Sequence, residues 1–136
     1  MAIEIQPVLI IEGDQSLRDV YKTALTVVPT PFRPIVTESG TEALEYFQQN
    51  RINTHIIVMG GDFQDMTAES LTERFRQISQ NPDDPCILWF IGEGYARLED
   101  PNFLRRKGAN EIIYERSLGP RELIAKLNEI NERFKV

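Results

Sequence analysis

The chain has 136 residues, a net charge of −6 and a single cysteine, Cys86. This length suits one domain, residues 1–136, and 41% hydrophobic with 26% charged residues is ordinary for a globular protein. One cysteine excludes an internal disulfide, and no apolar run approaches the about 18 residues that cross a bilayer. The acidic balance argues against nucleic-acid binding. We expect neither a membrane nor a cofactor.

The first residues, MAIEIQPVLII, lack the basic start and small-residue cleavage site of a signal peptide, which makes the cytoplasm the expected location. The charge is unevenly distributed along the chain. Residues 1–96 carry 6 basic and 14 acidic side chains, a net −8, whereas residues 97–136 carry 9 basic and 7 acidic, a net +2. This asymmetry suggests a partner face, although chance variation among surface charges accounts for it about as well.

The first half of the chain alternates short apolar runs with helical periods. VLII (8–11) reads as a strand covered on both faces, and the next helix is expected to bury a stripe at helical spacing: Leu17, Val20, Tyr21, Ala24, Leu25 and Val28. Asp14 or Ser16 is a suitable cap for that helix. RPIVTE (33–38) predicts a second strand, and SGTEALEYFQQN (39–50) a helix with Thr41 as a possible cap.

The second half continues the alternation. IIVM (56–59), CILWFI (86–91) and EIIY (111–114) are predicted strands, and the helix between the first two buries Leu71, Phe75 and Ile78. NFLRRKG (102–108) reads as a short helix that ends on Gly108. Pro120 suits the first turn of a last helix, which buries Leu123, Leu127, Ile130 and Phe134.

Five strands alternating with five helices predict an α/β fold: a doubly wound, five-stranded parallel sheet in three α/β/α layers, as in flavodoxin. Ligands of such sheets bind beyond the carboxyl ends of the strands. The residues that follow the strands are therefore the ones that bear on function. No linker, repeat or low-complexity segment interrupts the pattern, and the lack of a flanking segment suggests a stand-alone domain.

At these positions the sequence resembles the CheY-like receiver domain of two-component response regulators over essentially the whole chain. VLIIEGDQSLR is similar to the first strand and its acid loop, and GGDFQDMTAESLTERFR to the phosphoacceptor loop and third helix, without a gap. GANEIIY resembles the family's Gly-Ala stretch and fifth strand. The resemblance implies three acids around magnesium, a phosphoacceptor aspartate, a hydroxyl residue and a lysine, as phosphoryl transfer requires.

The sequence departs from that pattern at nearly every reactive position. The acid pair aligns with Glu12 and Gly13, and the phosphoacceptor position is Gly60, which has no side chain to phosphorylate. The hydroxyl position is Phe90, which we expect either in the core or in the space of a phosphoryl group. The lysine position is Glu115.

Two positions next to these also differ, because the family's proline and its aromatic switch residue correspond to Arg116 and Ile112. Such a set of changes predicts a degenerate receiver, or pseudo-receiver. The pocket that it would leave consists of these residues: Glu12, Gly13, Gly60, Phe90 and Glu115.

Two alternatives keep chemistry at the strand ends. Asp62 would be a displaced phosphoacceptor only if the gap-free register were broken, and Glu12, Asp14 and Asp62 would form at most a weak cation site. We expect these acids to be loop and helix-start residues, as we expect for Asp65. The vacated pocket around Gly13, Gly60 and Gly61 would suit a small-molecule sensor or residual enzyme, since glycine lets a ligand approach the backbone.

Other sites are weaker. EGDQS lacks the hydroxyl-rich loop of a flavodoxin, and the glycines of GEG (92–94) are too few for a dinucleotide fingerprint. His55 precedes a strand and is expected to end it, while Cys86 and Trp89 are expected in the core.

The resemblance to receivers implies docking through the face made by the fourth helix, the fifth strand and the last helix. The candidate residues on this face are mostly basic: Arg105, Arg106, Lys107, Tyr114, Arg116 and Arg121. An acidic protein partner or a second copy of the chain would fit there, because complementary charge speeds encounter. The alternative is a solvated basic helix end, which the helix dipole also favours.

Overall fold

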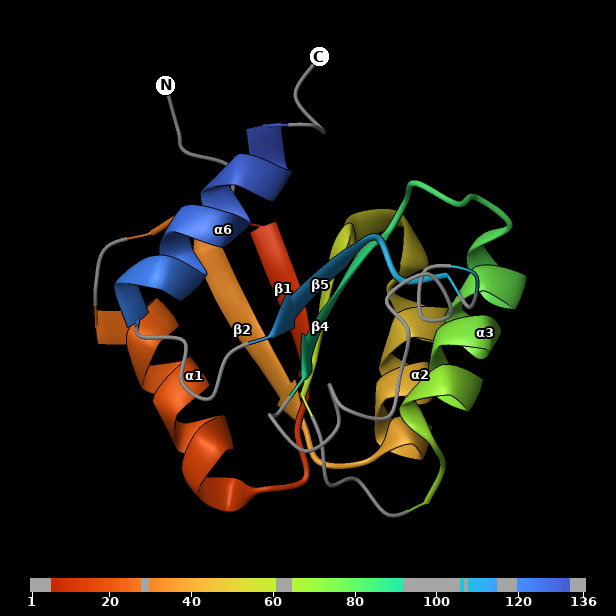
Figure 1. Cartoon of the computed structure of the whole chain (residues 1–136), viewed down its shortest axis with the longest axis horizontal. Coiled ribbons are helices and arrows are strands. Elements are labelled where there is room, and N and C mark those ends of the chain that lie inside the picture. Colours follow the sequence, from red (N-terminus) through yellow and green to blue (C-terminus); the bar gives the residue numbers. More distant parts are fainter. Residues whose placement is uncertain are drawn as a thin grey trace.

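The fold is a five-stranded parallel sheet with helices on both faces (Figure 1). The computed structural model describes residues 6–27, 30–60, 65–91, 106, 108–114 and 120–132. The strand order is β2-β1-β3-β4-β5. The strands span these residues: β1 Gln6–Ile11, β2 Phe32–Thr37, β3 Ile56–Met59, β4 Cys86–Ile91 and β5 Glu111–Tyr114. The predicted doubly wound α/β fold is confirmed.

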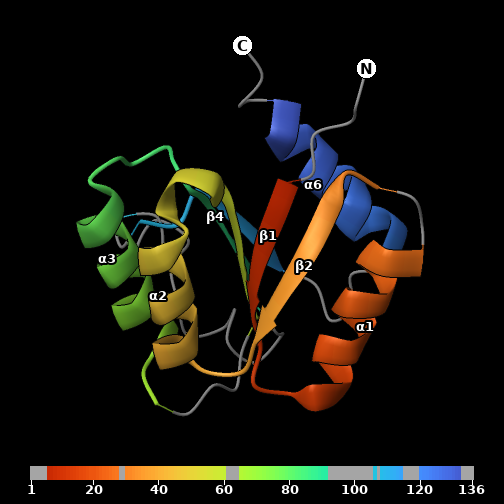
Figure 2. The same cartoon turned by 180° about the vertical axis from the view of Figure 1, so that it is seen from behind.

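Two helical layers cover the sheet. Helices α1 (Gln15–Val27) and α6 (Pro120–Glu132) lie on one face, and α2 (Gly40–Gln49) and α3 (Ala68–Ser79) on the other (Figures 1 and 2). A short 3-10 helix, Arg51–Asn53, leads into β3. In the described part of the chain no helix is both long enough and apolar enough to cross a membrane.

The sheet is buried on both faces, which explains why its strands are continuous apolar runs. In β1, Leu9 and Ile11 join the cluster under α2 and α3, while Val8 and Ile10 join the one under α1 and α6. Phe47 of α2 meets Phe75 of α3 edge-on, with ring centroids 5.2 Å apart. Trp89 is buried, as predicted, and its indole Nε1 donates a hydrogen bond of 3.0 Å to Thr72 Oγ1. Cys86 is also buried, in the cluster under α1 and α6.

Part of the buried stripe predicted for helix α1 is wrong. Tyr21, Ala24 and Leu25 are buried, but Leu17 is 41% exposed and Val20 is 44% exposed. The sequence period locates the inner face of the helix. It does not indicate that this face is buried only from Tyr21 onward, beyond the first part of the helix.

The helix starts follow capping chemistry, with one correction. The Asp14 side chain accepts a hydrogen bond from the Leu17 amide at 3.1 Å, so Asp14 caps α1. Helix α2 is capped by Ser39, which accepts from the Glu42 amide, and Thr41 is not its cap. Pro120 opens α6, as predicted.

A tie between α3 and the start of β5 fixes the far edge of the sheet. Gly108 has a φ of +117°, a backbone conformation that side-chain-bearing residues rarely adopt. Its carbonyl oxygen accepts hydrogen bonds from Nε and Nη2 of Arg76, at 3.0 and 2.9 Å. Asn110 adds to this tie, since its Oδ1 accepts from Arg76 and from the Ile87 amide. Gly108 and Asn110 of the Gly-Ala-Asn sequence before β5 thus hold the start of this strand against α3 and β4.

Candidate functional site

The carboxyl ends of β1 and β3 bring Glu12 and Gly60 together. Ile11 pairs with Met59 in the parallel ladder, so Glu12 and Gly60 follow as the next residues on adjacent strands. The Gly60 amide donates to the Ile11 carbonyl oxygen at 2.8 Å, and the Glu12 amide donates to the Thr37 carbonyl at 3.1 Å. The backbone on which both residues stand is therefore held by the sheet itself.

The carboxylate of Glu12 lies over the bare Cα of Gly60. A Cβ built on Gly60 would lie 2.4 Å from Glu12 Oε1 and 2.8 Å from its Cδ, closer than atoms pack. The Glu12 residue is only 2% exposed. In the described residues, the space of a residue-60 side chain is thus occupied by Glu12, an arrangement that the sequence did not predict.

Backbone and charge around Glu12 come from the start of α1. The Asp14 amide donates to Glu12 Oε2 at 3.3 Å. Arg18 donates through Nη1 to the carbonyl oxygens of Glu12 and Gly13, at 2.8 and 2.9 Å, and its Nη2 lies 3.6 Å from Glu38 Oε2. The amino-terminal end of a helix therefore lies beside the buried carboxylate, and a cation is hydrogen-bonded to the backbone of the same residue.

The negative charge of Glu12 also acts on Tyr21, which lies about one turn after Arg18 on α1. Burial and then the negative charge of Glu12 raise the pKa of Tyr21 to about 12. Because this folded-state pKa exceeds the ordinary value of 10.0, the neutral phenol contributes stability below about pH 10 that is lost as the pH rises toward 12. Glu12 and α1 are thus electrostatically coupled.

The candidate cation site is not assembled by the described residues. Among them, no group of three or more His, Cys, Asp or Glu side chains is placed to hold a metal ion. The Asp14 carboxylate faces the Leu17 amide in its capping role. The third candidate, Asp62, lies outside the described residues.

Several predicted site residues also lie outside that part of the chain. These are Gly61, Arg105, Lys107, Glu115 and Arg116, and of Phe90, Ile112, Tyr114 and Arg121 only the backbone is described. Whether Phe90 fills the space of a phosphoryl group therefore stays a prediction. Arg106, from the predicted docking face, is helical and exposed.

Asp65, expected to be a loop or helix-start residue, stabilises the start of a different helix from the one that follows it. Its carboxylate accepts from the Gly40 and Thr41 amides at 2.9 and 2.8 Å, and from Thr41 Oγ1 at 2.6 Å. The Thr41 hydroxyl above all, with the two amides, lowers the pKa of Asp65 to about 2. Helix α3, which follows Asp65, is capped by Thr67 instead.

Replacing Asp65 by asparagine is expected to lower the free energy of unfolding by about 1 kcal/mol at pH 7, because a neutral amide accepts the hydrogen bonds of Gly40 and Thr41 less strongly than a carboxylate does. Because the folded-state pKa is depressed, the carboxylate contributes stability above the ordinary pKa of 3.8, and this contribution fades as the pH falls toward 2. Urea titrations of parent and variant between pH 2 and 7 measure it. Asp19→Asn, at an exposed acid on α1, is the control. A stability gap that is independent of pH would contradict the capping role.

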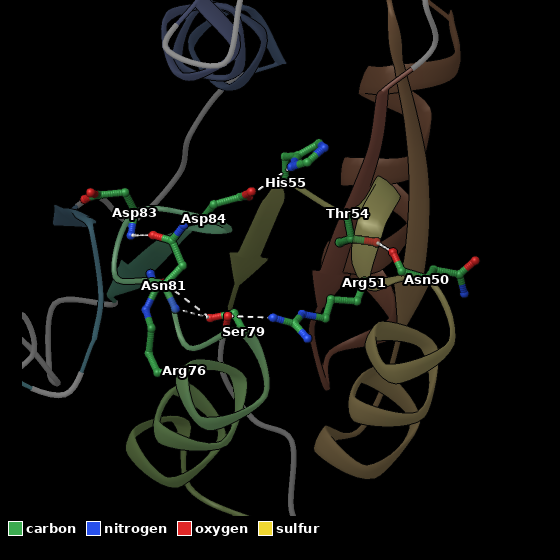
Figure 3. Close-up of polar contacts among 9 residues, drawn as sticks. All are labelled: Asn50, Arg51, Thr54, His55, Arg76, Ser79, Asn81, Asp83 and Asp84. Atoms are coloured by element: carbon green, nitrogen blue, oxygen red, sulfur yellow. Dashed lines mark hydrogen bonds and ion pairs between the residues drawn. The ribbon is translucent and has the colours of Figure 1, made fainter.

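A different polar network lies at the other end of the strands, before the first residues of β3 and β4 (Figure 3). Arg51 reaches from the 3-10 helix to the Ser79 carbonyl at 2.7 Å, and His55 Nδ1 lies 2.9 Å from Asp84 Oδ1. A hollow of about 710 Å³ lies nearby, lined by residues that include Glu73, Arg76 and Arg106. The contacts of Arg76 there join α3 to the turns before β4 and β5. The histidine does lie before a strand, as predicted.

Comparison with solved structures identifies the fold class as that of response regulator receiver domains. No family model matches the chain, and no curated protein sequence does. A receiver domain protein from Clostridium thermocellum is 16% identical, with a TM-score of 0.79 over 95% of this chain and 96% of that one. The chemotaxis response regulator CheY4 of Vibrio cholerae is 19% identical, with a TM-score of 0.74 over 93% and 98%.

A third similar structure is a two-component response regulator from Clostridium difficile, 16% identical, with a TM-score of 0.76 over 96% of this chain and 99% of that one. Identities at this level establish the flavodoxin-like receiver fold, and the function has to be argued from the site.

Proposed function

We propose that this chain is a pseudo-receiver: a signalling domain of the two-component response regulator type that acts by protein–protein interaction without being phosphorylated. The observation that carries the proposal is the pair at the strand ends. Gly60 has no carboxylate to accept a phosphoryl group, and the Glu12 side chain lies in the space above it. Because residue 60 cannot be phosphorylated, phosphorylation at this position cannot be the signal that switches the domain.

The charges of the site support the same proposal. In the receivers that the sequence resembles, several carboxylates require a divalent cation, and a lysine neutralises the phosphoryl group. Here one buried carboxylate, Glu12, faces the amide of Asp14 at the start of α1. The sequence places Glu115 where the lysine would be. A site with this charge needs no cation and would repel phosphate, so we infer a domain that is not an enzyme.

The proposed docking face comprises the predicted fourth helix, β5 and α6. Its basic residues lie in the part of the chain with a net charge of +2. Arg106 is exposed on it. An acidic surface of another signalling protein, or self-association of two copies through this face, would match that charge.

The alternatives assign chemistry to the strand ends. A sensor or residual enzyme would need room beside Gly60, and the position of Glu12 there argues against such a pocket. A receiver that is phosphorylated on Asp62 is decided by the experiment that tests the main proposal.

Incubation with acetyl phosphate and magnesium is expected to leave the intact mass of the protein unchanged, because no acceptor carboxylate stands at residue 60. An aspartate-bearing receiver treated in parallel is the positive control. The same treated and untreated samples, used as bait in cell extract, should retain the same proteins, identified by mass spectrometry. Alanine at both Arg105 and Arg106 should weaken that retention, whereas alanine at Lys22, an exposed cation on α1 outside this face, should not.

A stable phosphoryl adduct on the parent protein would overturn the proposal, and its loss in Asp62→Asn would establish the atypical receiver instead. Retention that depends on acetyl phosphate would also contradict it. Unchanged retention by the arginine variant would exclude the basic face and leave phosphorylation independence standing.

A further inference from the structure

The position of Glu12 has a meaning beyond the loss of an acceptor. We propose that the carboxyl ends of β1 and β3 form a carboxylate-binding site and that the side chain of Glu12 is its built-in ligand. The inference rests on the proposed function only in taking the site to be unphosphorylated. In this view the acid that remains after β1 takes the space of the acid missing after β3, and the glycine there makes room for it.

The shape of the site fits a carboxylate group. From the position of a Cβ on Gly60, Glu12 Oε1 lies at 2.4 Å, Cδ at 2.8 Å and Oε2 at 3.3 Å, so the whole carboxylate lies against the glycine. At 2% exposure, Glu12 is removed from water. A carboxylate is placed so deeply only where its surroundings stabilise it, because burying an unsupported charge is costly.

The polar groups around Glu12 supply that support. Oε2 accepts from the Asp14 amide, which immediately precedes the positive end of the α1 dipole. The Arg18 guanidinium is fixed on the carbonyl oxygens of Glu12 and Gly13, at 2.8 and 2.9 Å. The side chain of Arg18 is 18% exposed, and its Nη2 also lies 3.6 Å from Glu38 Oε2. Backbone donor, helix end and cation belong to the scaffold and remain when the Glu12 side chain is removed.

Removing that side chain should therefore leave a site for a free small carboxylate. In Glu12→Ala, acetate is expected to raise the urea midpoint in a saturable manner and to restore a large part of the lost stability. Sodium chloride at the same ionic strength and the neutral analogue acetamide should not. The parent protein, whose site is occupied, and Glu45→Ala, at an exposed acid of α2, should not respond to acetate specifically.

The isosteric variant Glu12→Gln separates charge from packing and keeps the test decisive if the alanine variant does not fold. It should lower the folding equilibrium constant by about tenfold or more, the scale of a lost charge-assisted hydrogen bond. It should also lower the pKa of Tyr21 from about 12, which titration of its phenol against Tyr21→Phe measures.

The proposal is overturned if Glu12→Gln is as stable as the parent, or if acetate shifts the alanine variant and both controls alike. Phosphorylation of the parent at another residue would refute the proposed function and leave acetate rescue unaffected. The two failures are therefore distinguishable.

Discussion

Gly60→Ala is expected to lower the free energy of unfolding by about 2–4 kcal/mol, far more than adding one methyl group usually does. The methyl carbon would lie 2.4 Å from Glu12 Oε1, and both residues are buried directly beyond the ends of strands of the central sheet. The structure can accept it only by moving the carboxylate from its donor at Asp14 or by shifting β3. Urea unfolding followed by circular dichroism, with an unchanged slope, measures the loss.

Gly40→Ala is the matched control for that experiment. A Cβ there would also meet an atom at 2.6 Å, but the atom belongs to the side chain of Met66, which is only half-buried. Methionine adapts to new neighbours more readily than a hydrogen-bonded carboxylate does. The loss at Gly40 should therefore stay below about 1 kcal/mol.

A double-mutant cycle then identifies the cause. In a Glu12→Ala background, Gly60→Ala should cost much less, with a coupling of about 1–3 kcal/mol between the two positions. Additive losses would mean that the glycine serves the backbone alone and does not make room for Glu12.

The sequence predicts most of this fold because its strands are buried on both faces. IIVM and CILWFI are apolar at every position, and both occur as strands with the predicted bounds. The helix starts were harder to predict, because Ser39 and Thr41 are both capable of capping α2. Which of the two caps the helix depends on Asp65, 24 residues further along the chain, whose carboxylate accepts a hydrogen bond from the Thr41 amide. Ser39 then accepts the hydrogen bond from the Glu42 amide.

The site is predictable only in part. The missing side chain at Gly60 and the longer acid at Glu12 are both visible in the sequence, each as a separate departure from receivers. That one fills the space of the other depends on the register of β1 against β3, which places the two residues side by side. A longer acid after one strand, next to a lost acid after the neighbouring strand, is the sequence signal that could have predicted this arrangement.

The Gly-Ala-Asn stretch before β5 carries the most specific local resemblance to receivers, and the structure gives its physical basis. A Cβ on Gly108 would lie 2.7 Å from Cγ of Arg76, and the φ of +117° already favours glycine. Asn110 Nδ2 donates to the Pro82 carbonyl at 2.8 Å, while its Oδ1 accepts from the Ile87 amide. The stretch therefore connects the edge of the sheet to α3 and to the turn before β4.

Arg76→Ala is expected to cost about 2–4 kcal/mol, because hydrogen bonds from a charged group are lost and their acceptors lose partners. The guanidinium donates to the carbonyls of Gly108 and Asn81 and to Asn110 Oδ1, and burial lowers the pKa of Arg76. Arg74→Ala, an exposed arginine two residues earlier on α3, should stay within about 0.5 kcal/mol of the parent.

Arg76→Lys separates the charge from the shape of the side chain. Lysine keeps the positive charge but lacks the planar fork that reaches Gly108 and Asn110 together, so at least half of the loss should remain. Urea unfolding ranks the variants, and amide hydrogen exchange at Ile87 and Asn110 reports whether the edge of the sheet loosens first. Full stability in the lysine variant would show that charge alone holds this edge, and equal losses in Arg74→Ala and Arg76→Ala would remove Arg76 from the tie altogether.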